Sequence, residues 1–182
     1  MMKIDLFNLA DVEKAIEVAD NYKQNMKKRM IKIMEKVRQE AIFEANRLYQ
    51  SASYAGFKDV VITATPVHVE DGKITFTLRA MGSTTLFIEF GTGIYPSAPS
   101  EAYGLVTSGN TVPHGQYGKK QGLKPNGWFY KGVVGQNPPS DTEVSTKKEG
   151  LVHTYGNAAT PFMYSARKVA EETFNKLIKE LK

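Results

Sequence analysis

The sequence predicts an α+β fold in which a long N-terminal helix and a C-terminal amphipathic helix pack on one side of an antiparallel β-meander. Three observations predict it: a helical apolar stripe within residues 9–50, alternating apolar and polar residues within 59–90, and a second helical stripe within 161–181. Residues 91–159 form a long insertion in which we expect a β-hairpin. Since 182 residues are enough for one core, we treat 1–182 as a single domain.

The first predicted element is a helix over residues 9–50. Its apolar residues recur at spacings of three and four, which places them on one stripe: Met26, Met30, Ile33, Val37, Ala41, Ala45 and Leu48. A continuous helix of this length would be on the order of 60 Å long, which is more than a domain of this size needs to cover its own sheet. Two alternatives stay open: part of the helix meets a neighbouring subunit, or the whole helix wraps across its own sheet.

Three strands are predicted after this helix. Residues 60–69 alternate in polarity, with Pro66 as an interruption or an edge position. Asp71-Gly72 is the dipeptide favoured in tight hairpins, and residues 74–80 form the return strand. Residues 84–90 are apolar and end at glycine, so we predict a third strand there.

The insertion and the last helix differ in composition and in predicted structure. Glycine and proline are concentrated in 91–159, where residues 128–130 and 151–155 are predicted to be the two strands of a projecting hairpin joined by the polar span 136–150. The last helix is predicted over 161–181, with Thr160 as its N-cap and Pro161 at its first position.

Composition excludes several classes of protein. The chain contains no cysteine, which excludes disulfides, thiolate metal sites and cysteine nucleophiles. No apolar run approaches the roughly 18 residues of a membrane span, and the N-terminus has no signal-peptide core. The net charge of +5 is spread along both terminal helices and the middle loop. A solvated surface explains this charge, and a wall facing packaged DNA is the alternative.

The sequence offers no recognisable catalytic set. The 3 histidines, His68, His114 and His153, have no metal-protease spacing, and no Gly-x-Ser-x-Gly pattern occurs. Gly91-Thr92-Gly93 follows an apolar segment, but the Lys-Ser/Thr of a phosphate-binding loop is missing. We therefore expect no enzyme, no catalytic residue, no cofactor and no metal ion.

Glu89 stands out because it interrupts an apolar segment between Ile88 and Phe90. In a strand it would point away from both neighbours. We expect its carboxylate either to accept backbone N–H groups from the region of Gly91 to Gly93, fixing the turn, or to pair with a cation of an adjacent subunit. A catalytic acid would need a second titratable group, and none is evident.

Basic and aromatic residues are mixed in the middle of the insertion. The candidate contacts to DNA or to a partner protein are Lys119, Lys120, Lys124, Trp128 and Tyr130. The segment lacks the signature of a known RNA-binding or single-strand-binding module. Two interpretations stay open, a nucleic-acid contact and a hairpin whose aromatic residues dock on their own domain or on a neighbour.

Two motifs and the order of elements resemble a known family. The motifs are Glu89-Phe90-Gly91-Thr92-Gly93 and Pro161-Phe162-Met163, separated by a variable loop and preceded by a long helix and β-strands. This arrangement resembles the head–tail joining proteins (neck, tail-completion or minor tail proteins) of long-tailed bacteriophages. Gly127-Trp128-Phe129-Tyr130 and His153-Thr154-Tyr155-Gly156 look like versions from phages of Gram-positive hosts. The long loop departs from the family pattern.

The resemblance implies a structural virion protein of a phage or prophage, located in the neck or tail after assembly in the host cytoplasm. It implies a ring, commonly of six subunits, around the DNA channel, with a head-side connector or portal-associated protein and a tail tube or tail terminator protein as partners, and no membrane contact. By this resemblance Glu89, Phe90, Gly91 and Thr92 would set the exit direction of the loop, and Phe162 would anchor the last helix to the sheet. The competing hypothesis is a small basic nucleic-acid-binding protein, and a third is an enzyme with an unrecognised site in the long loop.

Overall fold

The computed structural model describes residues 8–93, 95–96, 115–116, 118–121, 123–144 and 150–181. Its elements are α1 (Leu9–Ser51), β1 (Val61–Ala64), β2 (His68–Glu70), β3 (Lys73–Thr75), β4 (Leu78–Met81), α2 (Thr85–Phe90), β5 (Tyr95–Pro96), β6 (Gly115–Gln116), β7 (Trp128–Lys131), β8 (Glu143–Val144), β9 (Leu151–Thr154) and α4 (Phe162–Lys179). The α+β class is confirmed. His114 and parts of the predicted insertion, including residues 97–113 and 145–149, lie outside the described residues.

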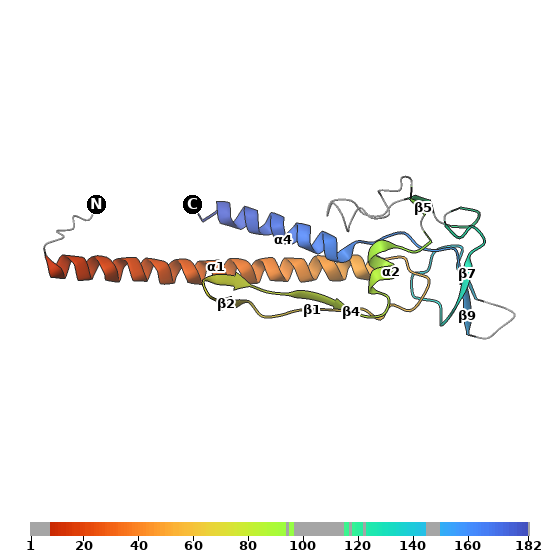
Figure 1. The fold of residues 1–182 in the computed structure, drawn as a ribbon, viewed down its shortest axis with the longest axis horizontal. Coiled ribbons are helices and arrows are strands. Elements are labelled where there is room, and N and C mark those ends of the chain that lie inside the picture. Colours follow the sequence, from red (N-terminus) through yellow and green to blue (C-terminus); the bar gives the residue numbers. More distant parts are fainter. Residues whose placement is uncertain are drawn as a thin grey trace.

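The predicted N-terminal helix is confirmed as α1, a single helix of 43 residues. Asn8 caps it by accepting a hydrogen bond from the backbone N–H of Ala10 at 3.1 Å. Figure 1 shows α1 running along most of the molecule, with α4 on one side of it in this view and strands β1 to β4 on the other. The first half of α1 extends beyond the ends of both. None of the described helices is apolar enough over a sufficient length to cross a membrane.

The hairpin between residues 61 and 81 is confirmed. β1 pairs antiparallel with β4, with Val61 opposite Met81 and Ala64 opposite Leu78, and β2 pairs with β3 beyond them. Pro66 lies in the break between β1 and β2, as its missing N–H leads one to expect. Asp71 and Gly72 form the turn with φ of 49° and 74°, the left-handed conformation that a tight Asp-Gly hairpin requires.

The predicted third strand is wrong, because residues 85–90 form the short helix α2. Asp59, just before β1, holds the start of this helix. Its carboxylate accepts hydrogen bonds from the N–H groups of Ser83 at 2.8 Å and Thr84 at 3.0 Å, and from both hydroxyls. The chain therefore leaves β4 in a helical turn. In place of the predicted three-stranded meander, the structure has a long two-stranded hairpin followed by a helix.

The predicted hairpin of the insertion is confirmed in part and extended. β7 pairs antiparallel with β9, with Trp128 opposite Thr154 and Lys131 opposite Leu151. Within the span that was expected only to join them, β8 adds to the other edge of β9, making a three-stranded sheet in the order β7-β9-β8. The segment after β7 returns to the connector after α1, since the N–H of Gly135 donates to the carbonyl of Ala55 at 2.9 Å.

The core forms where α1, α4, α2 and the hairpin meet. Its buried members are Ala41, Ala45, Tyr49, Ala52, Val60, Ile88, Phe162 and Ala166. Alanines on α1 leave room for α4 to pack closely along it, and Phe162 fills the space beside them with no exposed surface. The ring of Tyr49 lies 5.7 Å from that of Phe162, and its hydroxyl accepts a hydrogen bond from the N–H of Val60 at 2.9 Å. Met163 and Ala170 of α4 border the same core as Ile62, Leu78 and Ala80 of the hairpin.

Phe162→Ala should therefore destabilise the fold by roughly 3–5 kcal/mol, because it removes a fully buried ring and leaves a cavity. Urea unfolding followed by circular dichroism measures this loss. Leu86→Ala is the matched control, because Leu86 is 65% exposed and its truncation should cost less than about 0.5 kcal/mol. Equal losses in the two variants would contradict the assignment of Phe162 to the core.

Candidate functional site

The two motifs recognised in the sequence lie directly against each other. The N–H of Thr160 donates to the carbonyl of Ile88 at 2.8 Å, and Thr92 and Asn157 exchange both backbone hydrogen bonds at 3.0 Å. We call residues 87–92 together with residues 157–164 the joint. It holds together the two ends of the insertion, which begins and closes at this point.

Glu89 provides the central contact of the joint. Its two carboxylate oxygens accept hydrogen bonds from the backbone N–H groups of Met163 and Tyr164, each at 3.0 Å. Helix α4 begins after Pro161, which supplies no capping side chain. Glu89 therefore caps α4 from α2, and its negative charge lies at the positive end of the helix dipole.

This finding corrects two expectations. The partners of Glu89 are neither the N–H groups of Gly91 to Gly93 nor a cation of another subunit, but the first turn of α4. Thr160 was expected to cap α4, whereas the N-cap position belongs to Pro161. Both errors have one cause, since a cap contributed by a residue about seventy positions earlier leaves no local signal in the sequence.

Burial raises the pKa of the Glu89 carboxyl above its ordinary value, and the N–H groups of Met163, Tyr164 and Phe162 oppose this shift without cancelling it. The side chain is 7% exposed. The ionised form of a carboxyl group enclosed in this way depends on the two N–H donors, because removal from water disfavours its charge.

Asn157 is a member of the joint that sequence reasoning missed. It is 1% exposed. Its side-chain amide donates to the carbonyls of Phe87 at 3.3 Å and Ala158 at 3.0 Å, and its side-chain oxygen accepts a hydrogen bond from the hydroxyl of Thr92. Nothing in its local sequence distinguishes it from a loop asparagine, because its partners Phe87 and Thr92 lie 70 and 65 residues earlier in the chain.

Two glycines permit the close approach of the chains at the joint. Gly93 has a φ of 70°, and a Cβ there would lie 3.0 Å from the ring of Trp128. Gly156 has a φ of 108°, and a Cβ there would lie 2.1 Å from the carbonyl oxygen of Thr92. Both positions therefore require glycine, for conformation and for space.

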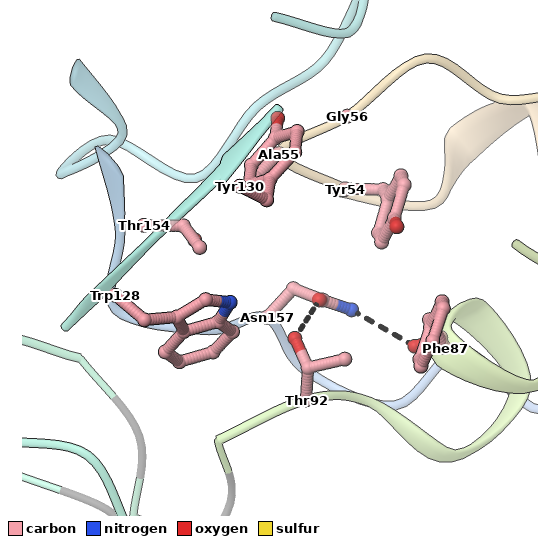
Figure 2. Close-up of a pocket in the computed structure, with 9 residues that line it drawn as sticks. All are labelled: Tyr54, Ala55, Gly56, Phe87, Thr92, Trp128, Tyr130, Thr154 and Asn157. Carbon is pink, nitrogen blue, oxygen red and sulfur yellow. Dashed lines mark hydrogen bonds between the residues drawn. The ribbon is translucent and has the colours of Figure 1, made fainter. Parts of the chain in front are cut away.

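A small pocket of about 250 Å³ lies beside the joint (Figure 2). It is lined by Tyr54, Ala55, Gly56, Phe87, Thr92, Trp128, Tyr130, Thr154 and Asn157. Burial raises the pKa of Tyr130 to about 12, with Tyr54 contributing, and its buried hydroxyl has no hydrogen-bond partner among the described residues. The lining holds no carboxylate and no imidazole, so it favours packing of apolar groups over acid–base chemistry.

The structure separates the residues expected to contact DNA or a partner. Lys119, Lys120 and Lys124 lie exposed in the loop before β7. Trp128 and Tyr130 face the pocket instead (Figure 2). The outward aromatic residue of β7 is Phe129, 58% exposed, with its ring 4.7 Å from that of His153. Trp128 and Tyr130 are thus docked on their own domain, whereas Phe129 and the three lysines are exposed.

The histidines of the described segments have structural neighbours. His153 lies between the rings of Phe129 and Tyr155, and its Nε2 is 3.1 Å from the carbonyl oxygen of Asn126. His68 is exposed and lies 3.6 Å from Glu70. Across the described ranges, no group of three or more His, Asp or Glu side chains could hold a metal ion.

Comparison with known proteins adds no family: no family model matches the chain, and neither a curated protein nor a solved structure matches it significantly. The fold and the joint therefore define only a class, an α+β protein whose insertion is closed by a helix-capping glutamate.

Glu89→Ala should destabilise the protein by about 2–3 kcal/mol, because it leaves two buried N–H groups of α4 without their acceptor. Glu89→Gln should lose less, since an amide oxygen still accepts a hydrogen bond. Thermal or urea unfolding measures both variants. Glu172→Ala, at an exposed position of α4, is the control, and a loss in Glu89→Ala no larger than in this control would contradict the capping role.

Glu89 and Asp59 should impose opposite pH dependences on stability. The pKa of Glu89 is raised by burial, so its contribution is complete below the unfolded value of about 4.5 and is lost as pH rises through the folded value. The pKa of Asp59 is lowered by the hydroxyls of Ser83 and Thr84, so its contribution is complete above about 3.8 and is lost as pH falls.

Urea unfolding across a pH series should therefore show the wild type losing stability relative to Glu89→Gln as pH rises above about 4.5. Relative to Asp59→Asn, the wild type should lose stability as pH falls below about 4. The same sign for both differences would contradict one of the two assignments.

Proposed function

We propose that this chain is a structural subunit of a tailed phage or prophage, acting as a ring-forming adaptor at the head–tail junction or the tail end. The observation that carries the proposal is the joint. The two short motifs on which the family resemblance rests, around Glu89 and around Phe162, make direct hydrogen bonds with each other across the base of a long insertion.

This arrangement suits an adaptor because it separates a fixed base from a variable part. The base consists of α1, α4, α2 and the hairpin around one core. The insertion leaves and re-enters this base at the joint, and its described part also contacts the connector after α1. In an adaptor, such an insertion would make the contacts with the protein above or below in the neck.

The surface of α1 also favours assembly. Its first half carries large apolar residues that are exposed, among them Leu9 (73%), Ile16 (57%) and Tyr22 (67%). Exposed apolar surface of this extent along one helix is typical of a protein that meets partners. In the proposal these partners are other copies of the chain, a head-side connector or portal-associated protein, and a tail tube or tail terminator protein, with packaged DNA passing through the ring.

A basic nucleic-acid-binding protein is the second candidate, and the exposed lysines of residues 119–124 favour it. The inward placement of Trp128 and Tyr130 weighs against it, because neither ring is presented for stacking on bases.

Negative-stain images and native mass of the purified protein over a range of concentrations test the proposal. We expect closed rings with a central channel, alone or stacked, because head-to-tail contacts related by rotation close on themselves. The matched variant Lys119→Ala/Lys120→Ala/Lys124→Ala should keep these rings. A protein that never forms rings and binds duplex DNA with an affinity that falls steeply with salt, and loses that affinity in the triple variant, would support the second candidate.

A further inference from the structure

We propose that two copies of this chain associate through the first half of α1, as an antiparallel pair related by a two-fold axis. The pairing requires neither a ring nor a virion, and it assigns a second copy of the chain to the exposed half of α1 that the adaptor proposal leaves open to several partners. Four observations lead to it: an uncovered apolar stripe, a groove that continues the stripe, small residues at its centre, and a separation of acidic from basic residues along the helix.

The apolar stripe of α1 does not stop where the body of the protein ends. It continues toward the N-terminus through Val12, Ala15, Ala19, Tyr22 and Met26. These spacings of three, four, three and four are those of a coiled-coil seam. The stripe lies on the same face of the helix as the buried residues of α1 that begin at Ile33. Every residue from 16 to 25 is exposed, so no described element covers this part of the seam.

The seam leads into an apolar groove of about 550 Å³ at the end of the body. Three elements line the groove: α1 through Met30 and Met34, the hairpin through Ile74 and Phe76, and α4 through Phe174. A second helix lying on the seam would therefore reach the groove with its end. This continuity indicates one binding surface that extends from the projecting half of α1 onto the body.

The charges of α1 are separated along its length. Within residues 9–20 the acidic residues are Asp11, Glu13, Glu17 and Asp20, against the single base Lys14. Within residues 21–32 the charged residues are all basic: Lys23, Lys27, Lys28, Arg29 and Lys32. Two such helices in parallel would place acid beside acid and base beside base. An antiparallel pair places the acidic segment of each copy beside the basic segment of the other, which selects a second copy as the occupant.

The seam also fixes the register. In an antiparallel pair, Ala19 of one copy lies opposite Tyr22 of the other, and Ala15 lies opposite Met26. The two alanines let the helices approach closely at the centre. The first turn of each helix, with the exposed Leu9, then lies over the mouth of the groove near Met30 of the other copy. A two-fold pair is closed, because the same patch is used on both copies.

Single cysteine substitutions test this geometry, since the chain contains no cysteine of its own. Ala15→Cys and Met26→Cys proteins are purified separately, mixed and oxidised mildly, and the cross-linked peptides are identified by mass spectrometry. We expect several-fold more disulfide between residues 15 and 26 in the mixture than between like residues in either variant alone. Asn21→Cys, on the opposite face of α1, should form no such dimer. Cross-links between like residues at both positions would show a parallel pair, and a monomer without cross-links would show no pairing, and either result would overturn the proposal.

A charge exchange provides an independent test on the intact chain. Glu13, Asp20, Lys23 and Lys27 share one flank of α1 beside the seam. Glu13→Lys/Asp20→Lys makes this flank wholly basic, and Lys23→Glu/Lys27→Glu makes it wholly acidic. All four positions are exposed, so both variants should keep the helical circular dichroism of the wild type. Sedimentation should show that each variant alone loses the paired species of the wild type and that an equal mixture restores it. Dimers of either variant alone, as stable as those of the wild type, would overturn the role of the charges.

Discussion

The capping of α4 by Glu89 is the interaction on which the rest of the structure depends. A carboxylate that is 7% exposed is unfavourable unless donors replace the lost water, and two N–H groups of α4 do so at 3.0 Å. The same N–H groups would be unsatisfied without the carboxylate, because Pro161 offers no cap. The N–H groups of α4 thus replace the water lost by the Glu89 carboxylate, and the carboxylate supplies the acceptor that these N–H groups lack. The contact also brings Phe162 to the core beside Tyr49, so electrostatics and packing fix the same geometry.

The joint closes the base of the insertion. The entropy of closing a loop grows only slowly with its length, so a base that is already closed by Glu89 and Asn157 tolerates a long excursion between them. The described parts of the insertion nevertheless pack on the base. Trp128 and Tyr130 face the pocket beside the joint, and Gly135 bonds to the connector after α1. Of the two interpretations that the sequence left open for Trp128 and Tyr130, the structure thus has both rings docked on their own domain, while Phe129 and the loop lysines are exposed.

The sequence predicted those elements whose signal is local. The spacing of apolar residues gave both long helices, and Asp71-Gly72 placed the first hairpin. The prediction of a strand was wrong for residues 85–90, because the six residues Thr-Leu-Phe-Ile-Glu-Phe are too few to distinguish a helical period from a strand period. Asp59 decides the outcome there by binding Ser83 and Thr84 across the hairpin. The joint was predictable only in part for the same reason: its motifs were visible, but the partner of Glu89 and the role of Asn157 arise from contacts about seventy residues apart.

The two ends of the molecule are built on different principles. At the joint, the buried polar side chains of Glu89 and Asn157 are matched to partners within the chain. At the other end α1 presents an apolar seam, exposed from residue 16 to residue 25, with its acids and bases in separate segments. A helix that served only to cover its own hairpin could begin near residue 30, where the groove of the body begins. The extra turns carry apolar residues in a coiled-coil spacing as well as segregated charge, and together these properties favour a helix of complementary charge running the opposite way, which a second copy of the same helix supplies.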